Sequence, residues 1–475
     1  MNSAKRIGAY RRYLIFAILL LTILACQATS PLSRPAESQA QSSAQTTRAL
    51  PTVTYTLPPT ASSTPSPTPS PTPLPPSPTP TLTATPTIIV TPSALQLEVF
   101  DDLWQTIWES YIYPDFNGLD WEAIREEYRP LVEAGLSDEQ FYLTMNEMIF
   151  RLEDDHSVYL SPRDVQEEDA EFAGTNDYVG IGVLASPVLE RNQATIILVF
   201  PGSPAEDAGL KSHDNLLAVD GQILVDEEGF HRELLRGPEG TTIELTVQTP
   251  GEEPRQLTVS RQRVTGSVPV PYEELITSQG KRIGYLLLAT FADETVDEQV
   301  GEALKALTTA GPLDGIILDN RQNGGGADTV ARSTLAFFTR GVGGYFTDRQ
   351  NHRRTFNIVG TDVNGSSQIP VVVLVGPDTV SFGELSSGIL KDMGEAYIIG
   401  ELTGGNIELL RGFDFADGSR AWIAHEKFVP RNHPEEDWEI SGIIPDLLAP
   451  SNWDEVTLET DPAVKAALDY FDGNE

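Results

Sequence analysis

The spacing of apolar positions changes twice along residues 95–475. From residue 95 to 152, apolar side chains recur every three or four positions, which predicts amphipathic helices. The first helix gathers one apolar face from six positions: Leu97, Phe100, Leu103, Trp104, Ile107 and Tyr111. A later helix begins at Ser137, with Glu139 close to the position that completes a capping box. We therefore expect the folded part of the chain to open with a helical segment.

From about residue 177 to 264 the pattern becomes one of short strands. Runs such as "YVGIGVLASPV", "ATIILVF" and "TTIELTVQT" are rich in β-branched residues and are bounded by turn residues. Two interruptions, "PGSPAEDAGL" and "EGFHRELLRGPEG", each predict a helix. This part of the chain is expected to form a compact module built mainly of strands.

After residue 266, continuous apolar strands alternate with amphipathic helices. "RIGYLLLAT", "DGIILDNR" and "PVVVLVG" are strands of this kind, and each is followed by a helical pattern. Such alternation predicts a largely parallel sheet that is covered on both faces. Ligand sites in these sheets form beyond the carboxyl ends of the strands. Both "LDNRQNGGGAD" and "GPDTVSFGEL" stand at such an end.

The first 93 residues lack any globular pattern. Four cations precede an apolar run over residues 13–24, which is short for a membrane-spanning helix and typical of a secretion signal. The following "ILAC" resembles the lipobox of bacterial lipoproteins, in which the cysteine, here Cys26, receives lipid. An uncleaved anchor helix and a simple secretory signal are the alternatives. In each case the remainder of the chain is expected to be exported.

A Pro-, Thr- and Ser-rich tract follows the signal and cannot bury a core. We assign residues 1–25 to a lipoprotein signal peptide and 26–93 to an extended, disordered tether. With Cys26 as its lipid anchor, the chain is expected to be a bacterial membrane lipoprotein whose folded part lies outside the cytoplasm.

The composition narrows the classes of function. The chain has 69 acidic and 32 basic residues and a net charge of −37, which argues against a nucleic-acid partner. Cys26 is the only cysteine, which excludes a disulfide framework and a thiol catalyst from the folded part. None of the six histidines pair at the short spacings of a zinc site, so we expect neither a metal site nor a cofactor.

Three candidate groups stand out for chemistry. Ser381 lies between a strand and a helix, where free N–H groups and the helix dipole favour an oxyanion, although a serine there is also a common N-cap. The run "NGGG", residues 323–326, could direct adjacent N–H groups at one anion or could form a plain turn. His156 lies in the acidic "EDDHS" and could be a base or a surface side chain. The residues alone leave these alternatives open.

Seven motifs, in order, resemble those of the carboxy-terminal processing (tail-specific) proteases and of the related tricorn protease core. They are "DDHSVYLSP", "GIGV", "PGSPAEDAGLKSHDNLLAVDGQ", "LRGPEGTTIELTV", "IGYLLLATF", "GIILDNRQNGGG" and the stretch from "VVVLVGPDTVSFGEL" to "ELTGGN". The resemblance implies an α/β protein in three parts. These are an N-terminal helical segment (94–176), a PDZ-like β-rich domain (177–265) and a crotonase-like ββα-spiral peptidase core (266–475).

The same resemblance implies roles for particular residues. Ser381 matches the nucleophile, and Gly324 or Gly325 together with Phe382 match the residues whose amides bind the oxyanion. In the PDZ-like domain, a glycine loop binds the C-terminal carboxylate of a protein or peptide substrate while its tail adds as a strand. The residues that match this loop are Gly180, Ile181, Gly182 and Val183.

One departure from the family pattern concerns the general base. Processing proteases carry a lysine at the end of "ExTxGK", where this chain has Asn406 in "ELTGGN". Asparagine has no proton acceptor of useful basicity. The tricorn-like branch uses a histidine and a glutamate instead, which match His156 and Glu439, the latter in "WEISGIIPD". The resemblance thus predicts that His156 takes the proton of Ser381, while Glu439 orients the imidazole or binds the active-site water.

Two functions follow from these observations. The first is an exported, lipid-anchored serine endopeptidase that cleaves proteins or peptides near their C-termini without a cofactor. The second is a catalytically inactive PDZ-containing binding or adaptor protein on a peptidase fold. Asn406, and "SFGE" in place of the family's "SASE"-like turn, favour the second.

Overall fold

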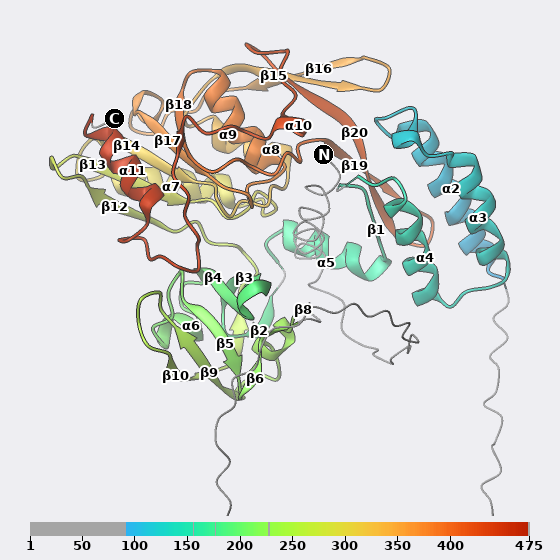
Figure 1. The fold of residues 1–475 in the computed structure, drawn as a ribbon, viewed down its shortest axis with the longest axis horizontal. Coiled ribbons are helices and arrows are strands. Elements are labelled where there is room, and N and C mark those ends of the chain that lie inside the picture. The colour runs from blue at the N-terminus through green and yellow to red at the C-terminus, as the bar shows by residue number, and fades with distance from the viewer. Residues whose placement is uncertain (1–91, 155, 176, 227–228, 474–475) are drawn as a thin grey trace, which may run out of the picture. The chain divides into compact units, whose positions relative to one another are not determined.

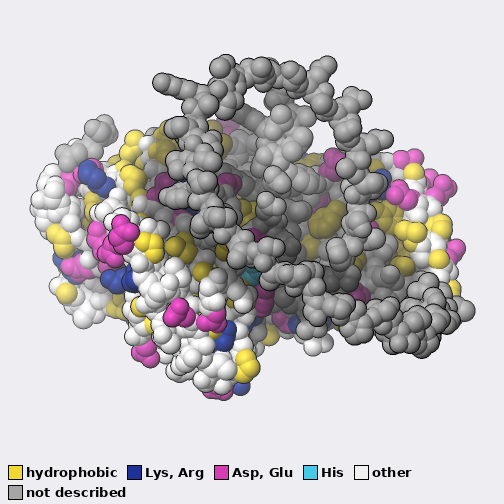
Figure 2. Space-filling model, turned by 60° about the horizontal axis from the view of Figure 1, so that its bottom comes forward, with side chains coloured by type: hydrophobic (Ala, Val, Ile, Leu, Met, Phe, Trp, Pro, Cys, Tyr) yellow, Lys and Arg dark blue, Asp and Glu magenta, His cyan; other side chains and the backbone are white. Residues whose placement is uncertain are grey.

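The computed structural model describes residues 92–475 apart from 155, 176, 227–228 and 474–475 (Figure 1). The predicted signal peptide, Cys26 and nearly all of the tether lie outside the described residues. Among the residues described, no helix is both long enough and apolar enough to cross a membrane. Acidic side chains are spread over the face of the molecule drawn in Figure 2, in keeping with the composition.

The helical segment forms as its apolar pattern predicts. Its elements are α2 (Ala94–Ser110), the 3₁₀ helix η1 (Phe116–Gly118), α3 (Trp121–Glu133) and α4 (Asp138–Phe150). Of the six apolar positions predicted for the first helix, Leu97 is partly buried and the other five are buried, the last of them being Tyr111, which directly follows α2. The capping box of α4 joins Ser137 to Gln140, not to Glu139, because Gln140 is the third helical residue and its amide reaches back to the N-cap.

A five-stranded sheet links this helical segment to the C-terminal part of the chain. It contains β1 (Val158–Leu160), β20 (Arg420–Pro430), β15 (Gly341–Asp348) and β16 (Arg353–Ile358) in that order, with β19 (Leu409–Asp414) also paired to β20. Val158 of β1 lies opposite Trp422 in an antiparallel register. Since β1 begins two residues after His156, this pairing brings His156 to residues that lie far along the chain.

The strand-rich module holds a sheet in the order β10-β9-β5-β4-β3, with β6 paired to β5. Its strands are β2 (Tyr178–Gly180), β3 (Val183–Val188), β4 (Gln193–Val199), β5 (Asn215–Val219), β6 (Gln222–Ile223), β7 (Val225–Asp226), β8 (Gly229–Phe230), β9 (Thr242–Gln248), β10 (Arg255–Ser260) and β11 (Gln262–Val264). Its helices are η2 (Leu189–Arg191), α6 (Pro204–Asp207) and η3 (Arg232–Leu235), and α5 (Pro162–Phe172) precedes it.

The second helix predicted in this module is much shorter than expected. "EGFHRELLRGPEG" gives strand β8 and the single 3₁₀ turn η3. Gly237 has φ +154°, outside the helical region, and Pro238 follows it. A proline disfavours helical geometry for the residue before it, and Gly237 is in fact not helical, so the helix does not continue through the second half of this stretch.

The core sheet has the order β12-β13-β14-β17-β18-β21 and is parallel from β13 to β21. Its strands are β12 (Tyr272–Ile276), β13 (Arg282–Leu287), β14 (Gly315–Asp319), β17 (Val371–Val375), β18 (Ala396–Gly400) and β21 (Leu447–Leu448). The accompanying helices are α7 (Val296–Thr308), α8 (Asp328–Leu335), η4 (Ser366–Gln368), α9 (Phe382–Asp392), α10 (Trp438–Ser441) and α11 (Pro462–Phe471).

Alternate residues of the central strands face opposite layers of this core. Ile316 and Leu318 of β14 belong to the apolar cluster that includes residues of α7, α8 and α9, whereas Ile317 belongs to the cluster with α11. The sheet is therefore buried on both faces, and the predicted mixed α/β architecture is confirmed. The carboxyl ends of β14 and β17 lead directly into the two loops singled out in the sequence.

A buried ion cluster holds the loop after β14. Arg321 contacts Asp319 and Asp461, each at 2.6 Å, and all three side chains are almost fully buried. Charges buried in this way are stable only when paired and hydrogen-bonded. Asp319 ends β14 and Asp461 caps α11, so the glycine-rich loop that follows Arg321 starts from a fixed position.

Candidate active site

Ser381 occupies a tight turn between β17 and α9. Its backbone has φ 53° and ψ −127°, a conformation that residues other than glycine rarely adopt. Such strain is common at functional positions. The serine precedes α9, but its side chain makes no capping hydrogen bond. Its N–H donates to the carbonyl of Asn406 at 2.7 Å, so the backbone is fixed while the hydroxyl stays uncommitted to the helix.

A buried carboxylate in the first turn of α9 holds the loop that carries Asn406. Glu384 accepts hydrogen bonds from the N–H groups of Gly405 and Asn406, both at 2.8 Å, and from the hydroxyl of Thr403. Burial raises the pKa of Glu384 to about 7 although these hydrogen bonds act in the opposite direction. Asn406 is thus built into the site through its backbone, which contacts both Glu384 and Ser381.

The glycine loop lies directly against Ser381. Gly325 has φ +87°, and a Cβ placed there would come within 2.5 Å of the Cβ of Ser381 and 3.1 Å of the N atom of Phe382. Any side chain at this position would collide with the serine. The Gly325 N–H donates to Asn323 Oδ1 at 2.9 Å, and the Gly324 N–H reaches the Ala289 carbonyl only at 3.4 Å.

The amide of Phe382 differs from these two. It is the first residue of α9, a position where a helix N–H has no partner within the helix. In the described part of the chain it has no other hydrogen-bond partner either. This N–H adjoins Ser381 and is available to an anion.

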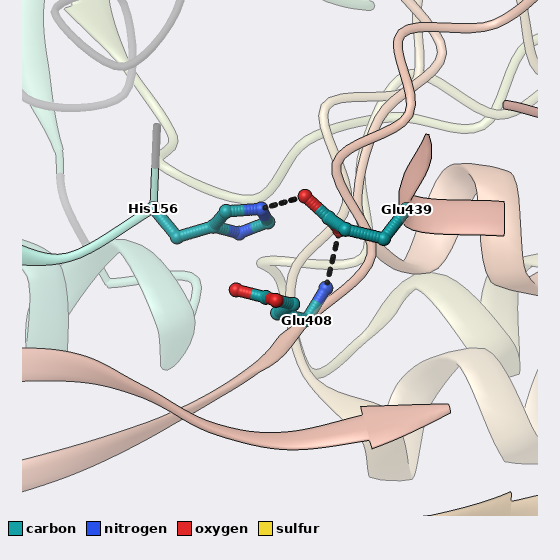
Figure 3. Close-up of side chains that lie close together, drawn as sticks. All are labelled: His156, Glu408 and Glu439. Carbon is teal, nitrogen blue, oxygen red and sulfur yellow. Dashed lines mark hydrogen bonds and ion pairs between the residues drawn. The ribbon is translucent and has the colours of Figure 1, made fainter. Parts of the chain in front are cut away.

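His156 and Glu439 form a pair (Figure 3). The Nε2 atom of His156 lies 3.3 Å from Oε1 of Glu439, and the His156 side chain is only 5% exposed. The other oxygen of Glu439 accepts from the N–H groups of Ile407 and Glu408 at 2.8 and 3.2 Å. The structure thus brings together two of the predicted residues from opposite ends of the folded chain, and gives Glu439 a fixed orientation.

Glu408 is a third group in this cluster and was not predicted from the sequence. It is 3% exposed, and its carboxylate lies within 4.8 Å of the polar atoms of His156 and Glu439. Its Oε1 accepts a hydrogen bond from the hydroxyl of Tyr113. A lone glutamate in "NIELL" carries no sequence signal, because its position depends on the pairing of β19 with β20.

Charge in the cluster favours the protonated imidazole. Burial lowers the pKa of His156, but the hydrogen bond and charge of Glu439, together with the charges of Glu408 and Asp154, outweigh it and raise the pKa to about 9. Burial raises the pKa of Glu408 to about 7. For Glu439, burial acts to raise the pKa, but His156 and the two backbone N–H groups hold it below its usual value. Near neutral pH the pair is an imidazolium and a carboxylate.

Residues 406–408 connect this pair to Ser381. The carbonyl of Asn406 accepts from the Ser381 N–H, and the next two N–H groups bind Glu439. Within the described residues, the Ser381 hydroxyl and the His156 ring are not hydrogen-bonded to each other. Catalytic hydrogen bonds are often long without substrate and tighten when substrate is bound.

Lys391, the lysine nearest to Ser381 in the sequence, belongs to a different environment. Its Nζ donates to the carbonyl of Ile444 at 2.6 Å and forms an ion pair with Asp446 at 2.8 Å. It stands near the C-terminal end of α9, whereas Ser381 precedes the helix. These contacts keep Lys391 from serving as the proton acceptor of Ser381.

The predicted tail-binding loop connects β2 to β3. Gly180 ends β2, Val183 begins β3, and the side chain of Ile181 is buried. Gly182 has φ +83°, and a Cβ there would lie 2.2 Å from that of Ser203, so glycine is required. β3 is the last strand of its sheet. An edge strand leaves a row of backbone groups open to an added strand.

Three family sequence patterns match consecutive parts of the chain. The Tricorn protease C1 domain matches residues 92–150, the PDZ domain matches 179–260 and Peptidase family S41 matches 282–449. The three matched ranges correspond to the helical segment, the strand-rich module and the α/β core.

Similar proteins agree with these matches. A carboxyl-terminal-processing protease of Synechocystis is 32% identical over 401 residues, which cover 81% of this chain and 89% of that protein. A chloroplastic carboxyl-terminal-processing peptidase of Arabidopsis thaliana is 27% identical over 75% of this chain and 69% of its own length.

Solved structures share the fold. The photosystem II D1 C-terminal processing protease has a TM-score of 0.53 and 26% identity, and the match covers 79% of this chain and 98% of that one. An S41 protease from Bacteroides fragilis has a TM-score of 0.55 at 16% identity, with 78% and 97% covered, and shows the fold alone. This chain therefore belongs to the family of PDZ-containing carboxyl-terminal-processing serine proteases and is a serine peptidase.

Proposed function

We propose that the chain is an exported, membrane-anchored serine endopeptidase that cleaves proteins or peptides near their C-termini, with Ser381 as nucleophile and His156 as base. The observation that carries this proposal is the arrangement of residues 406–408, which bind the Ser381 backbone on one side and Glu439, the partner of His156, on the other. A base that comes from a histidine accounts for a serine peptidase with Asn406 in place of the family lysine.

The reaction runs through a covalent ester. Ser381 Oγ attacks the substrate carbonyl carbon while neutral His156 accepts the hydroxyl proton. The oxyanion forms beside the Phe382 N–H and the glycine loop, where Gly324 or Gly325 supplies a second amide. His156 then gives its proton to the leaving amine as the peptide bond breaks. In the second half of the reaction, His156 takes a proton from water, the resulting hydroxide attacks the ester carbon, and His156 returns the proton to Ser381 Oγ as the acid product leaves.

Glu439 holds the imidazole in position during these steps. Its carboxylate is fixed by two backbone N–H groups and faces His156 Nε2. A carboxylate in this position stabilises the imidazolium that forms when Ser381 loses its proton. Nε2 of the ring contacts Glu439. For proton transfer in the substrate-bound enzyme, the ring must therefore be neutral and its other nitrogen, Nδ1, must face Ser381.

A fluorophosphonate probe tests the nucleophile. Such probes phosphonylate activated serines, so the wild-type chain should be labelled and Ser381→Ala should not, while its melting temperature stays within a few degrees. Ser367→Ala, a change of a partly exposed serine in η4, serves as the control and should be labelled like wild type. Folded wild-type protein that is neither labelled nor able to turn over a peptide library would instead support the inactive adaptor.

The pH dependence of activity tests the base. An imidazolium cannot accept the Ser381 proton, and His156 has a pKa of about 9. With a chelator present to remove trace metal ions, kcat/KM should therefore rise about tenfold per pH unit at lower pH and level off above about pH 9. The ascending limb of the profile should thus end near pH 9. Glu408→Gln removes a charge that raises the pKa of His156 and should shift this limb to lower pH, whereas Glu302→Gln on the surface of α7 should not. A rate independent of pH between 6 and 9 would contradict His156 as base.

The PDZ-like domain supplies the proposed selectivity for C-termini. Gly180, Ile181, Gly182 and Val183 lie in the loop that would bind the substrate carboxylate, and edge strand β3 would pair with the substrate tail. Peptides with a free carboxylate should therefore bind at least tenfold more tightly to the Ser381→Ala chain than the same peptides with an amidated C-terminus. Equal binding of the two forms would argue against this role.

Membrane anchoring through Cys26 completes the proposal. It is supported by the short apolar run that leads into "ILAC" and by the Pro-, Thr- and Ser-rich tract that follows, which has no charged residue between Arg48 and Glu98. In a bacterial host, the wild-type protein should fractionate with membranes, and Cys26→Ser should release the exported protein into the soluble fraction. Retention of Cys26→Ser in the membrane would favour an uncleaved anchor helix instead.

A further inference from the structure

The cluster of His156, Glu408 and Glu439 has the composition and spacing of a metal site (Figure 3). Each residue offers one nitrogen or oxygen, and these atoms all lie within 4.8 Å of one another. Zinc binds imidazole nitrogen and carboxylate oxygen at about 2.0–2.2 Å in tetrahedral geometry, which places ligand atoms roughly 3.3–3.5 Å apart. The 3.3 Å between His156 Nε2 and Glu439 Oε1 fits this spacing.

The two carboxylates are held in a way that suits ligands. Glu439 uses Oε2 for the N–H groups of Ile407 and Glu408, which leaves Oε1 facing the imidazole. Glu408 uses Oε1 for the hydroxyl of Tyr113, which leaves its second oxygen for an ion. Hydrogen bonds of this kind from surrounding groups orient metal ligands and strengthen binding.

Burial and charge also favour a cation here. His156 is 5% exposed and Glu408 3%, while Glu439 is 21% exposed and gives access from solvent. Two carboxylates that are this far removed from solvent require a compensating positive charge nearby. A proton on His156 supplies one such charge, and a divalent cation bound to all three side chains would supply two.

We propose that His156, Glu408 and Glu439 bind a divalent transition-metal ion of the Zn²⁺ type, and that the bound ion inhibits the peptidase. The binding site stands independently of the proposed function, but the inhibitory consequence rests on it. An imidazole that binds the ion through Nε2 carries its proton on Nδ1, which is then no longer free to accept the Ser381 proton. This proposal replaces the sequence-based expectation of no metal site. That expectation considered pairs of histidines at short spacing, and these ligands lie 31 to 283 residues apart.

Calorimetry with ZnCl₂ tests the binding site without any need for turnover. After removal of metal with EDTA, the full Ser381→Ala chain should bind one Zn²⁺ ion per chain, with Mg²⁺ binding far more weakly. Glu408→Gln in this background should weaken Zn²⁺ binding at least tenfold. His352→Ala, which removes an exposed histidine paired with Asp348, is the matched control and should leave binding unchanged.

Several outcomes would overturn the site. They are no stoichiometric Zn²⁺ binding, equal binding by the Glu408→Gln chain, or loss of binding in the His352→Ala control. If Glu408→Gln fails to fold, Tyr113→Phe provides a second variant, because it removes only the hydroxyl that positions Glu408. Visible absorption of bound Co²⁺, measured on the same chains, reports ligand geometry independently.

Inhibition is measured separately on the active chain. Zn²⁺ should suppress wild-type peptide hydrolysis, and EDTA should restore it. Zn²⁺ binding without any loss of activity would overturn the inhibitory part alone. A chain that binds Zn²⁺ but hydrolyses no peptide under any condition would contradict the proposed function and leave the metal site standing.

Discussion

The carboxylate of Glu439 joins two parts of the chain that are 283 residues apart, and the geometry of the candidate active site depends on it. One oxygen faces the imidazole of His156, and the other accepts the N–H groups of Ile407 and Glu408. Glu384 fixes the preceding loop in the same manner, through the N–H groups of Gly405 and Asn406. Residues 405–408 are thus held by two carboxylates, and the Ser381 backbone is bonded to this segment.

This arrangement explains how the site accommodates an asparagine at the position where the family pattern has a lysine. Asn406 contributes a backbone carbonyl to Ser381 and a backbone N–H to Glu384, and neither contact depends on its side chain. Lys391 cannot substitute, because it is bonded to Ile444 and Asp446. In the proposed mechanism the base comes from another element, and the pairing of β1 with β20 brings His156 to the C-terminal part that holds Glu439.

Apolar spacing allowed much of the fold to be predicted from the sequence. The buried face of α2 and the two-faced burial of β14 both follow from the positions of apolar side chains, since burial of those positions is what stabilises the elements. Details that depend on a single position were wrong: the capping box of α4 uses Gln140, and the helix expected before Pro238 is one 3₁₀ turn.

The site was predictable only in part. Ser381, His156 and Glu439 could be named because ordered motifs resemble those of a known family, whereas Glu408 has no motif of its own. Its place beside His156 arises from the register of β19 on β20 and from the hydroxyl of Tyr113, which reaches it from the loop after α2. A contact between residues 295 positions apart cannot be recognised from the spacing of apolar and polar residues around either one.

The kinetics of a single substitution test the central claim, that an imidazole held by Glu439 replaces the lysine. In His156→Ala, kcat/KM for a peptide substrate should fall about 10²–10⁴-fold, the usual contribution of a general base, while the melting temperature stays close to that of wild type. The control is His433→Ala, which removes a solvent-exposed histidine paired with Asp392 and should retain wild-type kinetics. A folded His156→Ala chain with undiminished kcat/KM would contradict the account.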